Sequence, residues 1–149
     1  MDSLLTEIDH VAIAVRDLEA AIAWYREVFG ATVEHREVVE SDGVAEALLR
    51  VADSYVQLLT PTRDDSPVAK YLERRGEGLH HIGYRVADCA AALEAVKASG
   101  ARVIDDTPRP GSRGTIVAFV HPAASFGTLI ELVEDPRAVS VGDAIATRG

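Results

Sequence analysis

The chain has 149 residues, of which 48% are hydrophobic and 26% are charged, a mixture typical of one globular domain with a substantial core. Its net charge of −9 argues against nucleic acid as the main partner, and its apolar runs are too short to span a membrane. The first ten residues are acidic and do not resemble a signal peptide. A single cysteine cannot form an intrachain disulfide, which fits a reducing, cytoplasmic setting. From these observations together we expect a cytoplasmic protein with neither a membrane nor a nucleic-acid partner.

The first half of the chain predicts a strand, a helix and three further strands. The short apolar run 9–15 predicts the strand. The segment 17–30 predicts the helix, because apolar residues recur at helical spacing between Asp17, a suitable N-cap, and Gly30, a suitable stop. Extended runs follow at 32–39, 44–51 and 55–60, and a short connecting helix is expected over 66–76.

The same order of elements then begins again. A strand is expected at 79–86, a helix at 88–100, and extended runs at 101–104, 115–120 and 128–133. When Ile8 is set against Leu79, His10 aligns with His81 and Asp17 with Asp88, each pair 71 positions apart. Helices do not alternate with every strand, which excludes a doubly wound sheet.

We therefore predict an α+β fold in which two pseudo-symmetric βαβββ modules form a cupped mixed sheet around a ligand site. Residues 1–149 would form a single domain. Module one covers about 8–61, the connecting helix about 66–76 and module two about 79–134, and a frayed tail is expected at 138–149.

Two adjacent histidines at the start of the second module pose a choice. Neighbouring side chains of a strand point to opposite faces, so His80 and His81 are not expected to serve one site. The repeat pairs His81 with His10, while His80 is expected on the bulky apolar face that packs under the helix. His10 shares its predicted face with alanines and His81 shares its face with Gly83, which predicts space for a ligand.

The repeat also aligns Gln57 with Glu131, which are 74 positions apart because the loops differ in length, and both lie inside otherwise apolar strands. Burying an amide or a carboxylate without a partner is costly, so these two side chains need one. A lone strand histidine is more often structural than a ligand. Repeat-matched histidines together with a repeat-matched Gln and Glu instead favour a divalent metal site, and such ligands suit Co²⁺, Mn²⁺, Ni²⁺, Fe²⁺ or Zn²⁺.

Several other residues carry weaker predictions. Glu46 alternates onto the face of its apolar neighbours, and it is either an inward acid–base group or an exposed residue of an edge strand. His35 and His121 are expected at the surface, and Cys89 is expected to be a small packing residue. The loops "ERRGEG" and "RPGSRG" fit solvated loops and anion binding equally well.

Six segments together identify a family resemblance from about residue 8 to 134: "IDHVAIAV", "AWYREVFG", "GVAEALL", "VQLLTP", "SPVAKYLERRGEGLHHI" and "HPAASFGTLIELVE". They resemble the vicinal oxygen chelate (glyoxalase/bleomycin resistance/dioxygenase) superfamily and, within it, the methylmalonyl-CoA epimerase family. This resemblance implies one divalent ion, most often Co²⁺, held by the same four residues: His10, Gln57, His81 and Glu131. It also implies a homodimer and a second carboxylate at Glu46.

The activity implied by the resemblance is the epimerisation of (2R)- and (2S)-methylmalonyl-CoA through an enolate. Glu46 and Glu131 would remove and return the proton on opposite faces. The alternatives are a glyoxalase I-type isomerase and a non-catalytic, small-molecule-binding resistance module. Gln57, where a bacterial glyoxalase I typically has glutamate, favours the epimerase, and intact ligands argue against the resistance module. The phosphates of CoA would need local positive charge, for which the candidates are Lys70, Arg74, Arg75, Arg109 and Arg113.

Overall fold

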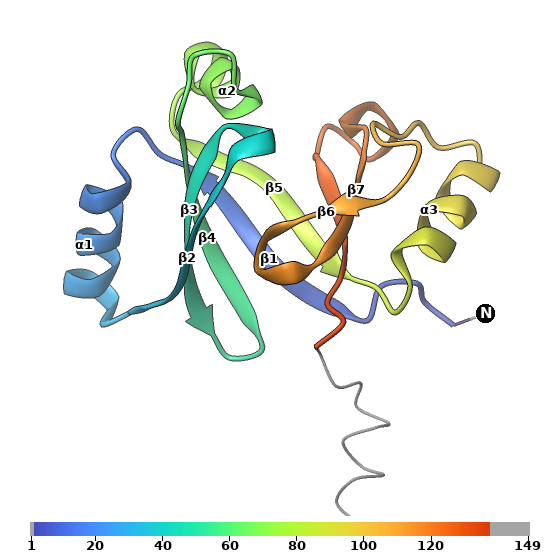
Figure 1. The fold of residues 1–149 in the computed structure, drawn as a ribbon, viewed down its shortest axis with the longest axis horizontal. Helices are drawn as coiled ribbons and strands as arrows, with labels where there is room; N and C mark the ends of the chain where they lie inside the picture. The colour runs from blue at the N-terminus through green and yellow to red at the C-terminus, as the bar shows by residue number, and fades with distance from the viewer. Residues whose placement is uncertain (1, 138–149) are drawn as a thin grey trace, which may run out of the picture.

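The computed structural model describes residues 2–137, and the tail predicted at 138–149 lies outside the described residues. Figure 1 shows two modules side by side, with α1 and α3 on their outer sides and the strands between them. The helices are α1 (Leu18–Phe29), α2 (Pro67–Arg75) and α3 (Cys89–Ala98). The strands are β1 (Glu7–Ala14), β2 (Val33–Val39), β3 (Val44–Val51), β4 (Ser54–Pro61), β5 (Gly78–Arg85), β6 (Arg109–Pro110), β7 (Ile116–Val120) and β8 (Ile130–Glu134). Short 3₁₀ helices lie at η1 (Glu40–Asp42), η2 (Ser112–Gly114) and η3 (Pro122–Ala124).

The strands form one mixed sheet in the order β2-β3-β4-β1-β5-β8-β7-β6. Within each half the first strand pairs in parallel with the last, β1 with β4 and β5 with β8, and the two halves join through the antiparallel pair β1–β5. Ala12 lies opposite Gln57 in the first half, and Gly83 lies opposite Glu131 in the second. These are equivalent positions of the repeat, so the predicted α+β fold with two related modules and a cupped mixed sheet is confirmed.

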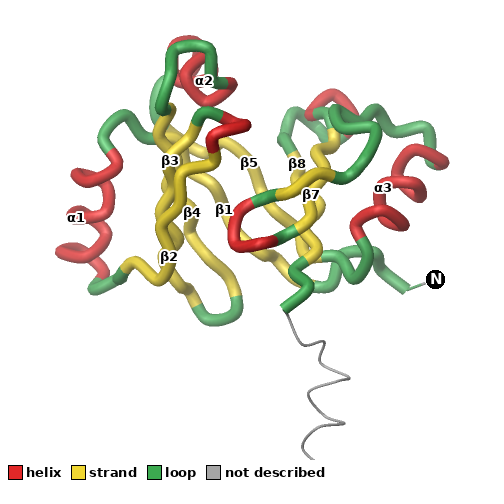
Figure 2. The backbone as a smooth tube through the Cα atoms, in the orientation of Figure 1, coloured by secondary structure: helices red, strands yellow, loops and turns green. Residues whose placement is uncertain are grey.

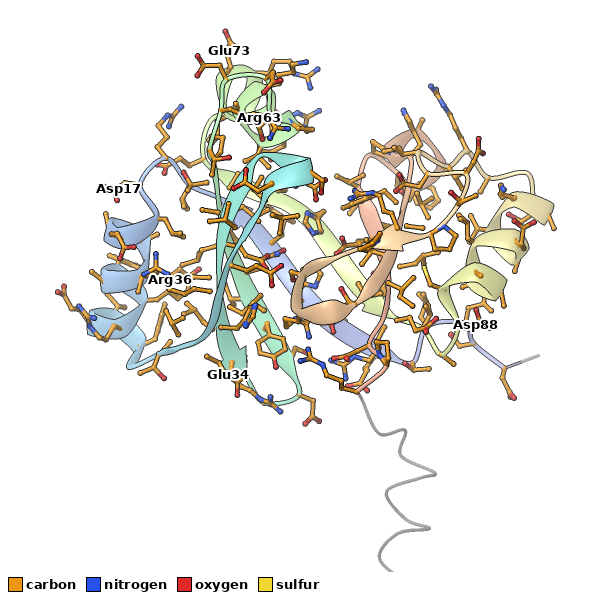
Figure 3. All side chains as sticks on the ribbon, viewed as in Figure 1. Asp17, Glu34, Arg36, Arg63, Glu73 and Asp88 are labelled. Carbon is orange, nitrogen blue, oxygen red and sulfur yellow. The ribbon has the colours of Figure 1, made fainter. Side chains whose placement is uncertain are left out.

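The helices begin where their caps predict. The Asp17 carboxylate accepts a hydrogen bond from the backbone N–H of Ala20 at the start of α1, and Asp88 accepts one from Ala91 at the start of α3. Figure 3 labels both caps, one in each module. The first helix ends at Gly30, whose left-handed φ of 69° an L side chain would adopt only with strain.

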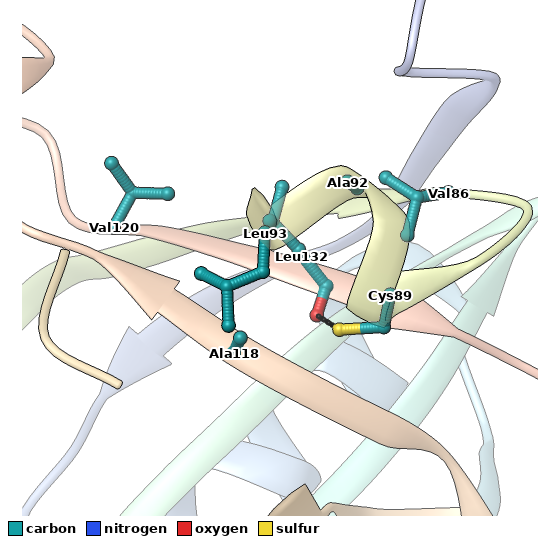
Figure 4. Packing of buried hydrophobic residues seen from close by; sticks show 7 residues of the cluster. All are labelled: Val86, Cys89, Ala92, Leu93, Ala118, Val120 and Leu132. Atoms are coloured by element: carbon teal, nitrogen blue, oxygen red, sulfur yellow. Dashed lines mark hydrogen bonds between the residues drawn. The ribbon is translucent and has the colours of Figure 1, made fainter. Parts of the chain in front are cut away.

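Each module packs its helix against the outer face of its own strands, as the tube view also shows (Figure 2). In the second module Leu93 of α3 lies in a cluster of buried residues with Ala118 and Leu132 of the strands (Figure 4). Cys89 belongs to the same cluster, and its thiol lies 3.8 Å from the carbonyl oxygen of Leu132, so its expected packing role is confirmed. With the outer faces covered by helices, the inner faces are left to form a site.

One predicted strand is wrong. The run 101–104 contributes only an isolated bridge, between Val103 and Val120. The reason is that the carboxylate of Asp105 accepts the hydrogen bond of the Phe119 N–H at 2.8 Å, taking a place that a strand backbone would fill. The other edge of β7, opposite β8, pairs instead with the two-residue β6, whose Pro110 has no N–H to extend a ladder.

Among residues 2–137, no helix is long and apolar enough to cross a membrane.

Candidate metal and acid–base site

The inner faces of both modules line one cavity of about 200 Å³. Five predicted site residues contribute to its wall, each from a different strand: His10 (β1), Glu46 (β3), Gln57 (β4), His81 (β5) and Glu131 (β8). The structure therefore brings together every residue that the sequence predicted for metal binding or proton transfer.

Three potential ligands converge at the middle of this cavity. The Nε2 atoms of His10 and His81 lie 2.9 Å apart. One carboxylate oxygen of Glu131 lies 2.9 Å from the first of these nitrogens and 3.6 Å from the second. Two imidazole nitrogens and a carboxylate oxygen in such proximity are a donor set that suits a divalent transition-metal ion.

Gln57 completes this donor set. Its amide nitrogen donates a hydrogen bond to the Glu46 carboxylate, which leaves the amide oxygen without a hydrogen-bond partner among the described residues. A buried acceptor with no donor is costly unless something electropositive approaches it. The orphaned oxygen therefore fits the fourth protein ligand of an ion held by His10, His81 and Glu131.

The two carboxylates of the cavity have opposite electrostatic environments. Burial raises the pKa of Glu46, which is only 1% exposed, and the neighbouring polar groups of Ser112 and Gln57 offset this effect only in part. Burial also tends to raise the pKa of Glu131, but the imidazole groups of His10 and His81 beside its carboxylate outweigh this effect and hold that pKa well below its usual range. Such a divergence between neighbouring carboxyl groups is typical of acid–base sites.

Glu46 lies inward, which answers the question left open by the sequence. Its strand β3 is flanked by β2 and β4, so it is not an edge strand. The remaining Glu46 oxygen, Oε1, is buried without a hydrogen-bond partner among the described residues. An unpaired carboxylate oxygen in a cavity wall is free to accept a proton from a bound molecule.

The prediction that His80 and His81 cannot serve one site is wrong. Both line the cavity, because a register shift between Ala12 and Ile13 on β1 leaves His80 as an extra residue of β5 and breaks the alternation of the strand. His80 does not join the cluster of buried residues against α3. Its ring packs edge-on against Tyr71 of α2, with the ring centroids 4.9 Å apart.

The small residues beside the paired histidines also play a different part from the predicted one. A Cβ on Gly83 would lie 2.2 Å from the ring of His10, so this glycine makes space for the histidine itself. Ala12 and Ala14 are fully buried in a core cluster with Val68 and Leu72 of α2, and they line no part of the cavity.

A buried charge network beside the site was not anticipated. Asp9 is 0% exposed, and its carboxylate accepts hydrogen bonds from His10 at 2.7 Å, from Arg113 at 2.6 Å and from Arg85 at 2.8 Å. Arg113 lies in another module and has a positive φ of 56°. The aspartate inside the apolar run 9–15 was the available signal, because a charge in a buried strand needs partners.

A groove leads from the cavity to the surface beside α2. His80 and His81 line both spaces, and the groove continues past Tyr71 to Arg74 and Arg75. Neither arginine forms an ion pair with another described residue. The other arginine candidates are already paired, Arg109 with Asp42 and Asp105, and Arg113 with Asp9 and Asp135. Lys70 lines neither space.

The remaining histidines do not belong to the cluster of His10, His81 and Glu131. His35 is half-exposed on β2 and lies 2.9 Å from the carboxylate of Glu37. Together with Glu46 these two residues form a second group of potential ligands, whose ligand atoms lie within 4.8 Å of one another. His121 caps η3 and lines the outer groove.

Comparison with known proteins gives consistent matches. Residues 9–119 match the model of the glyoxalase/bleomycin resistance protein/dioxygenase superfamily. An ethylmalonyl-CoA/methylmalonyl-CoA epimerase of Cereibacter sphaeroides is 40% identical over 131 residues, which cover 87% of this chain and 98% of that protein. The mitochondrial methylmalonyl-CoA epimerase of Homo sapiens is 35% identical over 129 residues, covering 86% of this chain and 73% of the human one.

Solved structures agree with these relatives. A methylmalonyl-CoA epimerase in complex with methylmalonyl-CoA and NH₄⁺ has a TM-score of 0.88 and 45% identity, and the match covers 91% of this chain and 99% of that one. A Streptomyces coelicolor methylmalonyl-CoA epimerase variant in complex with 2-nitronate-propionyl-CoA has the same TM-score of 0.88, with 44% identity over 91% of this chain and 99% of the other.

Proposed function

The chain belongs to the glyoxalase/bleomycin resistance protein/dioxygenase superfamily and, within it, to the methylmalonyl-CoA epimerase family, and we propose that it interconverts (2R)- and (2S)-methylmalonyl-CoA. The observation that carries this proposal is the pair of carboxylates, Glu46 and Glu131, that line one cavity with three further potential ligands. Inversion of a carbon centre through a planar intermediate needs proton-transfer groups on both faces, and two such groups are present.

The residues of the cavity fit a divalent metal ion, which His10, Gln57, His81 and Glu131 would hold. Co²⁺ is our first choice among Co²⁺, Mn²⁺, Ni²⁺, Zn²⁺ and Fe²⁺, because mixed nitrogen and oxygen ligands suit all of them and the family resemblance favours cobalt. When bound, the ion would supply the positive charge that stabilises an enolate oxygen.

Glu46 acts as the general base towards one epimer. Burial raises its pKa, which makes the ionised carboxylate a stronger proton acceptor, and its unpaired Oε1 is available to the substrate α-hydrogen. The amide of Gln57 fixes the other oxygen, so the carboxylate cannot rotate freely. After the enolate forms, a proton delivered to its opposite face completes the inversion.

Glu131 is our assignment for that opposite face. The imidazole groups of His10 and His81 beside it hold its pKa low, so Glu131 would first take a proton from solvent and would then, as a strong acid, give that proton to the enolate. The proton held by Glu46 would return to solvent. Glu131 is correspondingly the weaker of the two bases. The rate of α-proton removal should therefore differ between the two epimers, because Glu46 deprotonates one and Glu131 deprotonates the other.

The groove beside α2 would hold the coenzyme arm of the substrate. It begins at His80 and His81 in the cavity and ends at Arg74 and Arg75, whose guanidinium groups can pair with phosphate. Local positive charge of this kind offsets the net charge of −9. We place the enzyme in the cytoplasm, in agreement with its single buried thiol, and propose a homodimer by family resemblance.

Proton NMR in D₂O tests this function. The purified protein is incubated with one epimer of methylmalonyl-CoA, and we expect exchange of the α-hydrogen together with formation of the other epimer. The glutathione hemithioacetal of methylglyoxal serves as the competing substrate, and it should be converted poorly. Preferential turnover of the hemithioacetal would assign a glyoxalase I-type isomerase, while saturable binding of the CoA ester without exchange would assign a binding module.

A further inference from the structure

We propose that Asp9 and His80 are a pseudo-symmetric pair of positioning residues, each of which fixes the ring orientation and tautomer of the following histidine. The inference rests on the proposed function in one respect, because it takes His10 and His81 as metal ligands. It goes further by giving a role to a buried carboxylate and a partly buried imidazole that neither the ligand set nor the proton-transfer chemistry uses.

The two residues occupy equivalent irregularities of the sheet. In the β1–β5 ladder, Ile8 pairs with Tyr84 and His10 with Gly83, so Asp9 is an extra residue of β1. His80 is the corresponding extra residue of β5, 71 positions later. A β-bulge re-aims side chains, and here each bulge brings a residue beside the histidine that follows it.

Each bulge residue contacts the same atom of its histidine. An oxygen of the Asp9 carboxylate lies 2.7 Å from Nδ1 of His10, and Nδ1 of His80 lies 2.8 Å from Nδ1 of His81. A carboxylate only accepts, so the proton of His10 belongs on Nδ1. If His80 is likewise the acceptor, the proton of His81 also belongs on Nδ1.

This assignment leaves the Nε2 lone pairs of both rings unprotonated. These are the two atoms that face each other at 2.9 Å and that lie beside the Glu131 carboxylate. Both lone pairs then point at one place, as a shared cation requires. Partners of this kind orient metal-ligating histidines and raise their basicity in many proteins, and their loss typically costs about 10–100-fold in metal affinity.

The two partners are not equivalent in charge. Asp9 is fully buried and held by two guanidinium groups, Arg85 from β5 and Arg113 from η2, which lies 104 positions away in the sequence. Apart from its contact with His81, His80 packs against Tyr71 and forms no ion pair with another described residue. His10 therefore has an anionic partner and His81 has a neutral one. The Nε2 lone pair of His10 should consequently bind the metal ion more strongly than that of His81.

Metal titration tests the proposal without reference to turnover. The full-length protein, freed of metal by a chelator, is titrated with Co²⁺ while the visible absorption of the ion is recorded. The variants are Asp9→Asn, which keeps an acceptor but removes the charge, and His80→Leu, which removes the acceptor. His80→Asn is the matched control, because its amide oxygen can replace the Nδ1 acceptor. Thermal melts confirm that each variant is folded.

We expect Kd for Co²⁺ to rise about 10–100-fold in Asp9→Asn and about 10-fold in His80→Leu, with His80→Asn near wild type. In ¹⁵N-histidine-labelled, Zn²⁺-loaded protein, NMR should find Nδ1 protonated in both rings of the wild type. Folded His80→Leu and Asp9→Asn with Kd within about threefold of wild type would overturn the proposal, as would metal binding through Nδ1.

If Asp9→Asn does not fold, the comparison of His80→Leu with His80→Asn decides the question by itself. Failure of the wild type to bind Co²⁺ or Zn²⁺ would refute the metal site itself, whereas normal binding without epimerisation would refute only the proposed activity.

Discussion

Gln57 joins the two functions of the cavity, because its amide nitrogen donates to the Glu46 carboxylate while its amide oxygen is left buried without a donor. The nitrogen end orients the residue to which we assign the base. The oxygen end fits a metal ion. A single side chain thus sets the position of the proton acceptor relative to the ion that would stabilise the enolate.

Glu46→Gln should retain the fold, the metal and binding of the CoA ester but lose most epimerisation. Glutamine is nearly isosteric and its oxygen can still accept the Gln57 hydrogen bond, but it accepts no proton at neutral pH. General acid–base groups contribute about 10²–10⁴-fold, and we expect a fall in kcat within that range.

The control for this variant is Glu27→Gln, the same change at an exposed position of α1. In D₂O the Glu46→Gln protein should still exchange the α-hydrogen of the epimer that Glu131 deprotonates, without inverting it. Wild-type epimerisation in Glu46→Gln would mean that the second proton comes from water or another side chain.

His81→Ala should lose both bound metal and activity. It removes one of the two imidazole nitrogens that lie 2.9 Å apart, and a site of three remaining ligands holds a divalent ion more weakly. Elemental analysis after dialysis measures the metal content. His121→Ala is the matched control, because His121 caps η3 and belongs to no group of potential metal ligands among the described residues. Equal metal content in the two variants would refute the assignment of His81.

Gly83→Ala tests the close packing at the centre of the sheet. The added Cβ would lie 2.2 Å from the ring of His10, so the ring must move. We expect a folded but less stable protein whose Co²⁺ affinity falls at least 10-fold, because the Nε2 atom no longer meets the other ligands. Circular dichroism and metal titration measure the two effects, and unchanged metal affinity would place His10 outside the site.

Stability should depend on pH through Glu46. Burial raises its pKa in the folded protein above the ordinary value of 4.5, so the folded state binds the proton more tightly than the unfolded state. Below that ordinary value the carboxyl is neutral in both states. As pH rises from the pKa of Glu46 in the unfolded protein to its higher pKa in the folded protein, the free energy of unfolding should fall. The fall is measured relative to a variant in which residue 46 cannot ionise.

Glu46→Gln supplies that variant. Measured by urea unfolding of metal-free protein, the two proteins should be about equally stable at pH 4, and the variant should be the more stable at pH 7. A difference that is constant over this range would show that ionisation of Glu46 does not destabilise the folded state.

The basic end of the groove should govern substrate affinity. Arg74→Ala and Arg75→Ala remove guanidinium groups that line it, and each should raise KM for methylmalonyl-CoA several-fold with little change in kcat. Lys70→Ala on the same helix is the control, since Lys70 does not line the groove. An equal rise in KM for all three variants would indicate a general charge effect, and no rise would place the coenzyme arm elsewhere.

The sequence alone predicted the α+β fold, the two related modules and the residues that meet in the cavity. It could do so because a strand has a fixed period and a repeat carries equivalent residues to equivalent places. Once His10 and His81 matched at a spacing of 71, Gln57 and Glu131 followed from the same symmetry. Helix ends were predictable because caps such as Asp17 and Gly30 act through local geometry.

Only the tertiary structure decided the features that depend on distant contacts. Whether Glu46 pointed inward depended on which strands flank β3. The bulge that brings His80 into the cavity comes from the register between β1 and β5, which the period of either strand alone does not reveal. Asp9 meets Arg113 across 104 positions, and a buried ion pair forms only where folding brings both charges together. Sequence periodicity specifies the face of a strand, but register and packing between modules determine what that face meets.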